Sequence, residues 1–181
     1  MQLYHGSSNG DIKQLKPQVS NHEKEYVYFI THEVLAILYA YNPIERPGGF
    51  YTYKFDKNGQ VYYDEFFPDQ LKKIYQGKSG YVYSINNDDY NLQHLEKMPW
   101  VYLSEKPIKV DKPKFIKDIY EEILLLEKQG KIIVNRYEAM SEELKQKNRS
   151  VIVKDIEMKN LKNRKENSYA KFLHEHFPDL I

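Results

Sequence analysis

Apolar and polar residues alternate twice near the start of the chain, and an apolar run with a helical period follows. Residues 2–5 have the pattern of a short strand, and residues 25–31 have the pattern of a second one. Residues 32–42 then carry apolar side chains at helical spacing, with Thr31 as a good N-cap and Pro43 as a stop. The pattern therefore predicts strand, loop, strand and helix in this order.

The strongest local signal is a β-hairpin. Alternating aromatic residues at 51–55 and 61–63 are joined through Asn58 and Gly59. Both turn residues tolerate positive φ, which the preferred two-residue hairpin turns require. Just before the hairpin, residues 46–49 have the composition of a loop.

Further strands are expected up to residue 110, with one short helix among them. The short helix is predicted at 68–76 and is ended by Gly77, and strands are predicted at 80–85, 100–103 and 108–110. Strands that cluster without regular β–α–β alternation indicate the α+β class with a mostly antiparallel sheet.

The pattern changes after residue 112. Apolar positions spaced by three and four residues predict an amphipathic helix at 115–126, with Gly130 as its stop. Residues 131–134 fit either a strand or a connector, and the charged remainder is helix-prone. We therefore divide the chain into a core, residues 1–112, and a helical C-terminal extension packed on it, residues 113–181.

Charge and composition exclude several classes of function. The 27 basic and 26 acidic residues give a net charge of +1, so no overall field attracts nucleic acid or an anionic membrane. The absence of cysteine excludes disulfides and thiolate chemistry. Apolar runs stay below the roughly 18 residues typical of a membrane-spanning helix, and the N-terminus lacks the features of a signal peptide. We expect a soluble, cytoplasmic protein with no membrane partner and no evident nucleic-acid partner.

Seventeen tyrosines are the unusual feature of the composition. Many lie in alternating runs, such as 51–53 and 81–83, which suit the half-buried faces of a sheet. A surface that stacks on nucleotide bases is the second interpretation of the same residues.

The motif His5-Gly6-Ser7 at the end of the first strand is the main candidate for a site. An imidazole at a strand end can form a hydrogen bond to a ribose hydroxyl. Glycine lets the backbone approach a ligand closely enough to offer its N–H and C=O groups to an amide such as nicotinamide. An ordinary strand-to-loop transition with a structural histidine is the alternative.

The order of these parts resembles the opening of the ADP-ribosyltransferase-like superfamily. It is most similar in layout to the small bacterial branch that includes rifampin ADP-ribosyltransferase and relatives that begin with Tyr-His-Gly-Ser. The resemblance covers residues 2–110 and is concentrated in 3–7 and 26–41. It implies a split, mostly antiparallel sheet that binds NAD as a substrate in a cleft, with no metal.

The resemblance also implies functions for individual residues. His5 would contact the ribose on the nicotinamide side, and the Gly6 backbone would hold the carboxamide. Tyr28 would stack on the nicotinamide in the rifampin-type layout, whereas Tyr39 would do so in the poly-ADP-ribose-polymerase layout. Thr31 matches a Ser or Thr often found at that strand end. The expected NAD-contacting residues are therefore His5, Gly6, Ser7, Tyr28, Thr31 and Tyr39.

The acidic residue of the family is the element that the chain lacks at its usual place. Many members carry a Glu at the start of a late strand, but a Met-Pro pair precedes residues 100–103 here. Rifampin-type enzymes use an Asp after the middle strands, where this chain has Asp64 and Glu65; Glu96 and Glu105 are the next candidates. The expected catalytic residues are His5, Tyr28, Asp64 and Glu65.

Other motifs fit structural interpretations better. The helix after Thr31 has a His-Glu pair without the second His of a zinc protease, and His174 and His176 are two residues apart, which is not one helical face. Gly77 to Gly80 lacks the spacing and the following helix of a phosphate-binding loop. The basic run 159–165 is flanked by glutamates and fits a solvated helix face.

Two functions stay open, and a third ranks last. The first is an NAD-dependent ADP-ribosyltransferase that acts on an acceptor the sequence does not define. The second is a catalytically degenerate module on the same fold that binds a nucleotide or a protein. The third is an RNA 2′-phosphotransferase, which needs a cradle of arginines, whereas the four arginines here are scattered.

Overall fold

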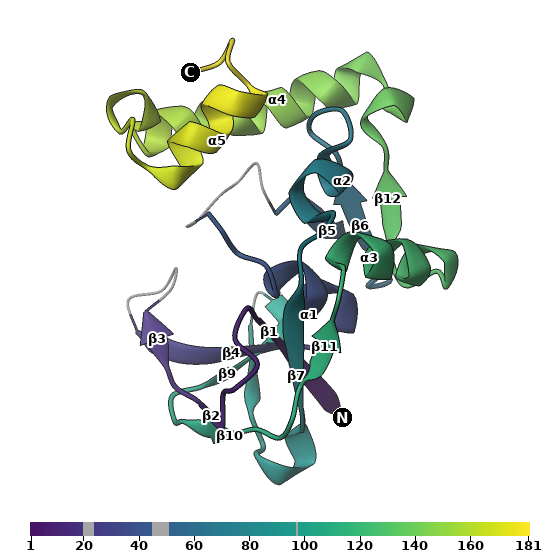
Figure 1. The fold of residues 1–181 in the computed structure, drawn as a ribbon, viewed down its shortest axis with the longest axis vertical. Helices are drawn as coiled ribbons and strands as arrows, with labels where there is room; N and C mark the ends of the chain where they lie inside the picture. Colours follow the sequence, from purple (N-terminus) through teal and green to yellow (C-terminus); the bar gives the residue numbers. More distant parts are fainter. Residues whose placement is uncertain (20–23, 45–50, 97) are drawn as a thin grey trace. The chain divides into compact units, whose positions relative to one another are not determined.

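The computed structural model describes residues 1–19, 24–44, 51–96 and 98–181 (Figure 1). It confirms the predicted α+β class, with a mostly antiparallel, curled sheet, smaller sheets and helices towards the C-terminus. The loop expected at residues 46–49 lies outside the described residues.

The chain forms two compact units, and each of them is built from two separate segments. The first comprises Met1–Asn42 and Tyr75–Ile123, and the second comprises Pro43–Ile74 and Leu124–Ile181. Residues just beyond the division expected at residue 112 pair with the sheet of the first unit.

The first unit contains the largest sheet. Its strands follow the order β11-β7-β1-β4-β9-β8, with β3 paired to β4, and all of these neighbours are antiparallel. The strands are β1 Gln2–Ser7, β3 Gln18–Val19, β4 Glu25–Ile30, β7 Gly80–Asn86, β8 Gln93–Leu95, β9 Met98–Ser104 and β11 Lys114–Ile116. A small separate sheet pairs β2 Gln14–Leu15 with β10 Ile108–Lys109, and a single 3₁₀ turn, η1 Asn87–Asp89, follows β7.

One face of this sheet supplies an apolar core. Alternate residues of the central strands point to the same side, and their side chains are joined by those of β2 and β10. The buried members of the cluster are Leu3, Leu15, Val27, Phe29, Ile85 and Ile108. Leu3 and His5 lie two residues apart on β1, so their side chains point to the same face of the sheet. The His5 side chain therefore lies at the edge of this core.

Helix α1, Glu33–Tyr39, packs directly on the backbone of β1. A Cβ atom on Gly6 would stand 2.7 Å from the Ala40 nitrogen and would collide with the Ala36 carbonyl oxygen. The helix buries the continuous run from Val34 to Leu38. Glycine at position 6 is therefore required by the packing of the helix on the strand.

The start of α1 differs from the prediction. The N-cap is His32 instead of Thr31, because the Thr31 N–H still donates to the Trp100 carbonyl as part of the sheet, at 3.0 Å. The first helical hydrogen bonds accordingly go to the His32 carbonyl. The helix ends at Tyr39, three residues before the predicted end at residue 42.

The second unit contains a sheet with the order β12-β6-β5. The predicted hairpin is confirmed, with β5 Tyr53–Phe55 antiparallel to β6 Val61–Asp64. The ambiguous run at 131–134 contains strand β12, Ile133–Asn135, which is parallel to β6. The remaining helices are α2 Gln70–Tyr75, α3 Ile119–Lys128, η2 Tyr137–Ala139, α4 Glu142–Met158, η3 Leu161–Asn163 and α5 Ser168–His176.

The turn of the hairpin is longer than the predicted two-residue turn. The Asp56 N–H donates to the Gln60 carbonyl at 3.1 Å, and Gly59 has a φ of 81°. The Asp56 carboxylate accepts the N–H groups of Asn58 and Gln60 at 2.8 and 3.0 Å. An acidic side chain thus stabilises a turn in which Gly59 alone adopts positive φ.

The predicted helix at 115–126 is wrong in its first part. Residues 114–116 form β11, where Ile116 is buried and Phe115 is exposed, and the helix begins at Ile119. The Asp118 carboxylate accepts the Glu121 N–H at 3.2 Å and so favours the helix start at this point. Gly130, with a φ of 72°, follows the helix as predicted.

Helices α4 and α5 pack against each other in the second unit (Figure 1). The Tyr169 hydroxyl donates to the buried Asp155 carboxylate at 2.9 Å, and Lys159 donates to the same group at 2.8 Å. No helix of the described part of the chain is long and apolar enough to span a membrane.

Candidate functional site

The centre of the candidate site is the half-buried imidazole of His5. Strand β1 pairs with β7 over all six of its residues, but with β4 only where Tyr4 meets Ile30. Next to this pair, His5 Nδ1 lies 2.8 Å from the Tyr28 carbonyl oxygen. The side chain thus joins β1 to β4 where the backbone pairing has ended.

This contact fixes the tautomer of His5. A carbonyl oxygen only accepts hydrogen bonds, so Nδ1 must carry the proton and Nε2 keeps its lone pair in the neutral ring. Burial lowers the pKa of His5 below its usual value of 6.5, although the hydrogen bond to Tyr28 opposes this shift. The ring is therefore neutral near pH 7, and Nε2 is a hydrogen-bond acceptor with no partner among the described residues.

The aromatic ring beside the His5 imidazole belongs to Phe29, with centroids 5.9 Å apart. Phe29 is buried, and Tyr83 stands opposite His5 on the other neighbouring strand. Neither residue belongs to the motifs that predict the site. Their alternation within 25–31 and 80–85 is the signal that places them on the core face.

Gly6 and Ser7 complete the motif with different contacts. The close backbone approach that Gly6 permits is to helix α1, and its contact with a carboxamide stays a prediction. Ser7 Oγ accepts the Asn9 N–H at 3.1 Å at the point where β1 ends. Since the hydroxyl is the acceptor in this bond, its own proton can be donated to a ligand.

The other residues predicted to contact NAD lie on elements next to β1. Tyr28 is half-buried on β4, and its ring contacts that of Tyr26 edge-on, with centroids 6.0 Å apart. Thr31 Oγ1 lies 2.8 Å from His32 Nδ1. Tyr39 ends helix α1, and its carbonyl carbon lies beside Gly6. All belong to the first unit, and the stacking of either tyrosine on nicotinamide stays a prediction.

Asp64 and Glu65 belong to the second unit and are both buried. Asp64 pairs with Lys54 and accepts a hydrogen bond from the Asn135 amide at 2.6 Å. The two oxygens of Glu65 accept the N–H groups of Leu71 and Tyr137, each at 3.1 Å. These carboxylates therefore connect β6 with its neighbours in the second unit, and their part in catalysis stays a prediction.

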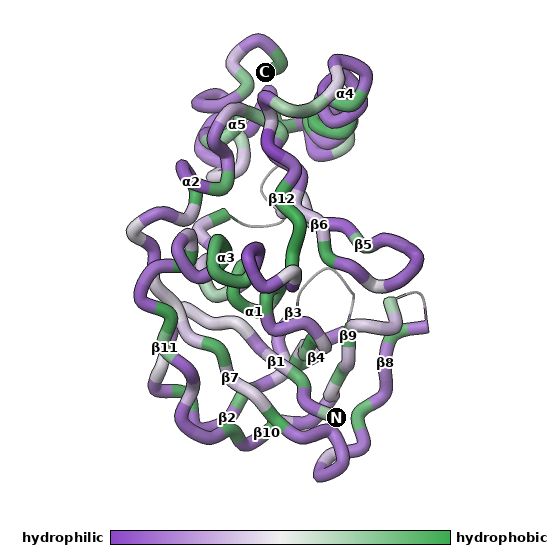
Figure 2. The backbone as a smooth tube through the Cα atoms, turned by 90° about the vertical axis from the view of Figure 1, so that its right-hand side faces the viewer, coloured by the Kyte–Doolittle hydropathy of each residue, from purple (hydrophilic) through white to green (hydrophobic). Residues whose placement is uncertain are grey.

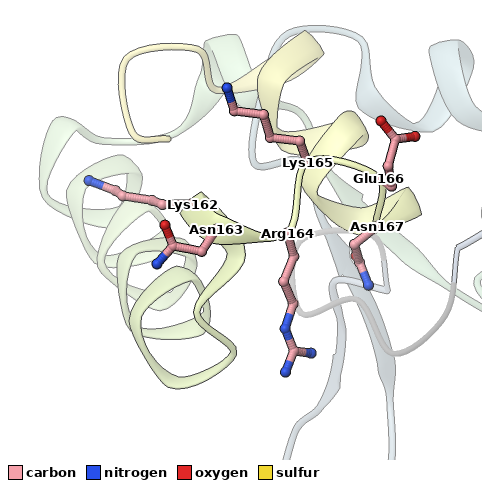
Figure 3. Close-up of a pocket in the computed structure, with 6 residues that line it drawn as sticks. All are labelled: Lys162, Asn163, Arg164, Lys165, Glu166 and Asn167. Carbon is pink, nitrogen blue, oxygen red and sulfur yellow. The ribbon is translucent and has the colours of Figure 1, made fainter.

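Two surface hollows of about 510 and 480 Å³ are lined by other residues. The first lies along residues 162–167, where Figure 3 shows the cationic side chains of Lys162, Arg164 and Lys165 pointing in different directions. The second lies at the end of β7 and includes Tyr90 and Asp111. Within the described ranges, no group of three His, Cys, Asp or Glu side chains is placed to hold a metal ion.

Comparisons of the chain with protein-family models, with curated proteins and with solved structures found no match. The geometry around His5 and the resemblance of the N-terminal motifs are therefore what supports a function for this chain.

Proposed function

We propose that this chain binds NAD at the end of strand β1 and is an ADP-ribosyltransferase-like protein that transfers ADP-ribose to an acceptor. The observation that carries the proposal is the His5 imidazole, whose Nδ1 is held by the Tyr28 carbonyl and whose Nε2 is an open acceptor. A ribose hydroxyl is a donor that matches this acceptor. The resemblance carried by residues 3–7 and 26–41 leads to the same ligand.

The transfer breaks the bond between ribose C1′ and nicotinamide, which leaves as a neutral molecule. C1′ bonds to the nucleophilic atom of the acceptor, and that atom gives up its proton to the solvent. Positive charge builds up on the ribose during this step, and a carboxylate close to the ring stabilises it. His5 would orient the ribose. The resemblance assigns stacking on the departing ring to Tyr28 or Tyr39, of which Tyr28 alternates with Phe29 and so points to the opposite face of the sheet from His5.

The resemblance makes Asp64 and Glu65 the candidate carboxylates for this step; they belong to the second unit, whereas His5 belongs to the first. The acceptor is a protein, a nucleic acid or a small molecule.

Calorimetry with NAD and ADP-ribose tests the binding step. Replacing His5→Ala removes the ribose acceptor, so we expect the affinity for both ligands to fall about tenfold, the usual effect of losing one well-placed hydrogen bond. The matched control is His174→Ala, which removes an exposed histidine on α5. Equal affinities for wild type and His5→Ala would contradict the proposal.

A second candidate function is nucleotide binding without turnover, and one observation favours it. Each carboxylate oxygen of Asp64 and Glu65 already has a partner within the second unit. A carboxylate that holds two backbone N–H groups is costly to redirect towards a ligand, because those groups would be left buried and unpaired.

Release of nicotinamide from NAD distinguishes the two functions. For an enzyme, the double replacement Asp64→Asn with Glu65→Gln lowers turnover by about 10²–10³, while the affinity for NAD stays within a few-fold. Glu143→Gln on the exposed start of α4 is the control. Turnover by the double variant at the wild-type rate would exclude these carboxylates and make Glu96 or Glu105 the next candidate. No turnover by wild type would favour the binding module.

A further inference from the structure

A basic loop joins helices α4 and α5 in the second unit. The sequence predicts a solvated helix face for residues 159–165, but the structure places them in the 3₁₀ turn η3 and the residues around it, before the N-cap of α5 at Asn167. Between residues 159 and 171 the chain has five basic side chains and one acidic one, although its net charge is only +1. The connection is hydrophilic throughout from residue 162 to residue 167 (Figure 2).

Two of the three carboxylates near this loop in the chain are already paired. Asp155 accepts a hydrogen bond from Lys159 at 2.8 Å, and Glu166 accepts one from Lys171 at 2.7 Å. The third carboxylate, Glu157, lies on α4. The cationic side chains that line the hollow of about 510 Å³ form no ion pair within the described part of the chain; they are Lys162, Arg164 and Lys165. A local excess of positive charge therefore remains on this surface, and it attracts anions.

The backbone of the loop is held in one conformation. Leu161 is buried beneath it, with 2% of its surface exposed. The Asn163 amide donates to the Asn160 side-chain oxygen at 2.7 Å, and the Asn167 N–H donates to the Arg164 carbonyl at 2.9 Å. The loop can therefore present its cationic side chains to a partner without first ordering its backbone.

The directions of the three cationic side chains indicate the kind of anion. They point away from the loop in different directions and do not converge (Figure 3). A site for a single small anion needs donors that converge on it. A polyanion carries charges repeated along its length, so each cation can meet a different phosphate group. The arrangement favours an extended polyanion.

Nucleic acid fits this surface better than an anionic membrane does. Binding to a membrane surface depends on apolar side chains that enter the lipid as well as on basic ones. Within residues 158–167, Met158 is the only exposed apolar side chain, since Leu161 is buried. Nucleic-acid phosphates need no apolar contact, because the affinity for them is electrostatic. The same ten residues contain no aromatic side chain to stack on bases.

We infer that the loop of residues 159–167 is a nucleic-acid-binding surface on which Lys162, Arg164 and Lys165 each contact a different phosphate group. Contacts to phosphates do not depend on the base sequence. The inference goes beyond NAD binding and does not rest on it, because the loop belongs to the second unit and His5 to the first.

Fluorescence anisotropy at several salt concentrations tests the surface, with a labelled DNA duplex and a labelled single-stranded RNA as probes. Three phosphate contacts give a slope of about −2.7 for the duplex and about −2.1 for the single strand in a plot of log affinity against log salt concentration. We expect a dissociation constant on the order of 10⁻⁴ M at about 50 mM salt. Arg164→Gln should lower the affinity about tenfold and reduce the slope by about one.

A triple replacement, its matched control and a conservative variant complete the test. Binding should become undetectable when all three cations of the loop are neutralised, by Lys162→Gln, Arg164→Gln and Lys165→Gln. The control changes the net charge equally at three exposed lysines elsewhere in the second unit and should bind as wild type does; it combines Lys57→Gln, Lys128→Gln and Lys131→Gln. Lys162→Arg with Lys165→Arg keeps the charges and should retain the affinity.

Four results would overturn the inference. Equal losses in the triple variant and its control would show an effect of net charge alone. Inorganic phosphate that binds wild type as tightly as the duplex does would indicate a site for a small anion. Binding to phosphatidylserine vesicles without binding to either nucleic acid would make the surface a membrane contact. Absence of binding to both nucleic acids at low salt would exclude the surface, and the His5 site would stand.

Discussion

At the scale of single residues, the account depends on which nitrogen of His5 carries the proton. The Tyr28 carbonyl determines this, and burial keeps the ring neutral by lowering its pKa. The sequence could predict His5 as a site residue from its place at a strand end. It could not predict the tautomer, because the partner is a backbone carbonyl 23 residues away in the chain.

The hydrogen-bond partners of Asp64 and Glu65 are also distant in the chain, so the sequence could not predict them. The sequence correctly places Asp64 at the end of the hairpin's second strand. The hydrogen-bond partners of Asp64 and Glu65 include Asn135 and Tyr137, which lie more than 70 residues further along the chain. A pattern read over a few neighbouring residues contains no information about such contacts.

A methyl group at position 6 tests the packing of α1 on β1. Gly6→Ala places a Cβ atom against the backbone of Ala36 and Ala40, so the helix must move away from the strand. We expect the free energy of unfolding to fall by about 1–3 kcal/mol, as in other overpacked cores, in denaturant titrations. The exposed Ser8→Ala is the control. An unchanged midpoint for Gly6→Ala would show that the helix does not lie on this residue.

At the scale of elements, periodicity predicted most strands and helices and failed where two periods overlap. Phe115 fits the helical spacing of the residues that follow it, but β7 offers a strand edge, and the segment pairs with it before the helix begins. Helix α1 begins one residue later than predicted for a related reason, because the Thr31 N–H still donates a hydrogen bond within the sheet. In both cases a tertiary hydrogen bond outweighed the local preference.

Helix α5 gives a prediction about pH at this scale. His176 stacks on Phe67 with centroids 4.2 Å apart and also contacts Phe172. Burial lowers the pKa of His176, Lys73 lowers it further, and Glu175 raises it. The folded state therefore disfavours the protonated ring. The contribution of this group to stability is complete above the usual pKa of 6.5 and is lost as the pH falls through the lowered value.

Urea unfolding at several pH values measures this effect. Between about pH 8 and about pH 5, the free energy of unfolding of wild type should decrease, and His176→Phe should decrease less because its ring does not titrate. His5 also has a lowered pKa, so the free energy of unfolding of the His176→Phe variant still depends on pH to some extent. Parallel pH profiles for the two proteins would contradict the assignment of His176.

At the scale of the whole molecule, each compact unit is assembled from two segments that are distant in the chain. Strand β12 pairs in parallel with β6 about 70 residues earlier, and β11 joins the sheet of the first unit. The sequence predicted the α+β class because that class depends on local patterns. It could not predict the pairing of distant segments, which depends on contacts that periodicity does not record.

The most direct test of the central claim is the ¹⁵N NMR spectrum of the His5 imidazole during a titration with NAD. The account predicts the Nδ1-protonated neutral form in the free protein and a shift of the Nε2 resonance as NAD is added, because Nε2 accepts the ribose hydroxyl. His5→Ala identifies the signals. A free protein with the proton on Nε2, or an Nε2 resonance that stays unchanged at saturating NAD, would contradict the account.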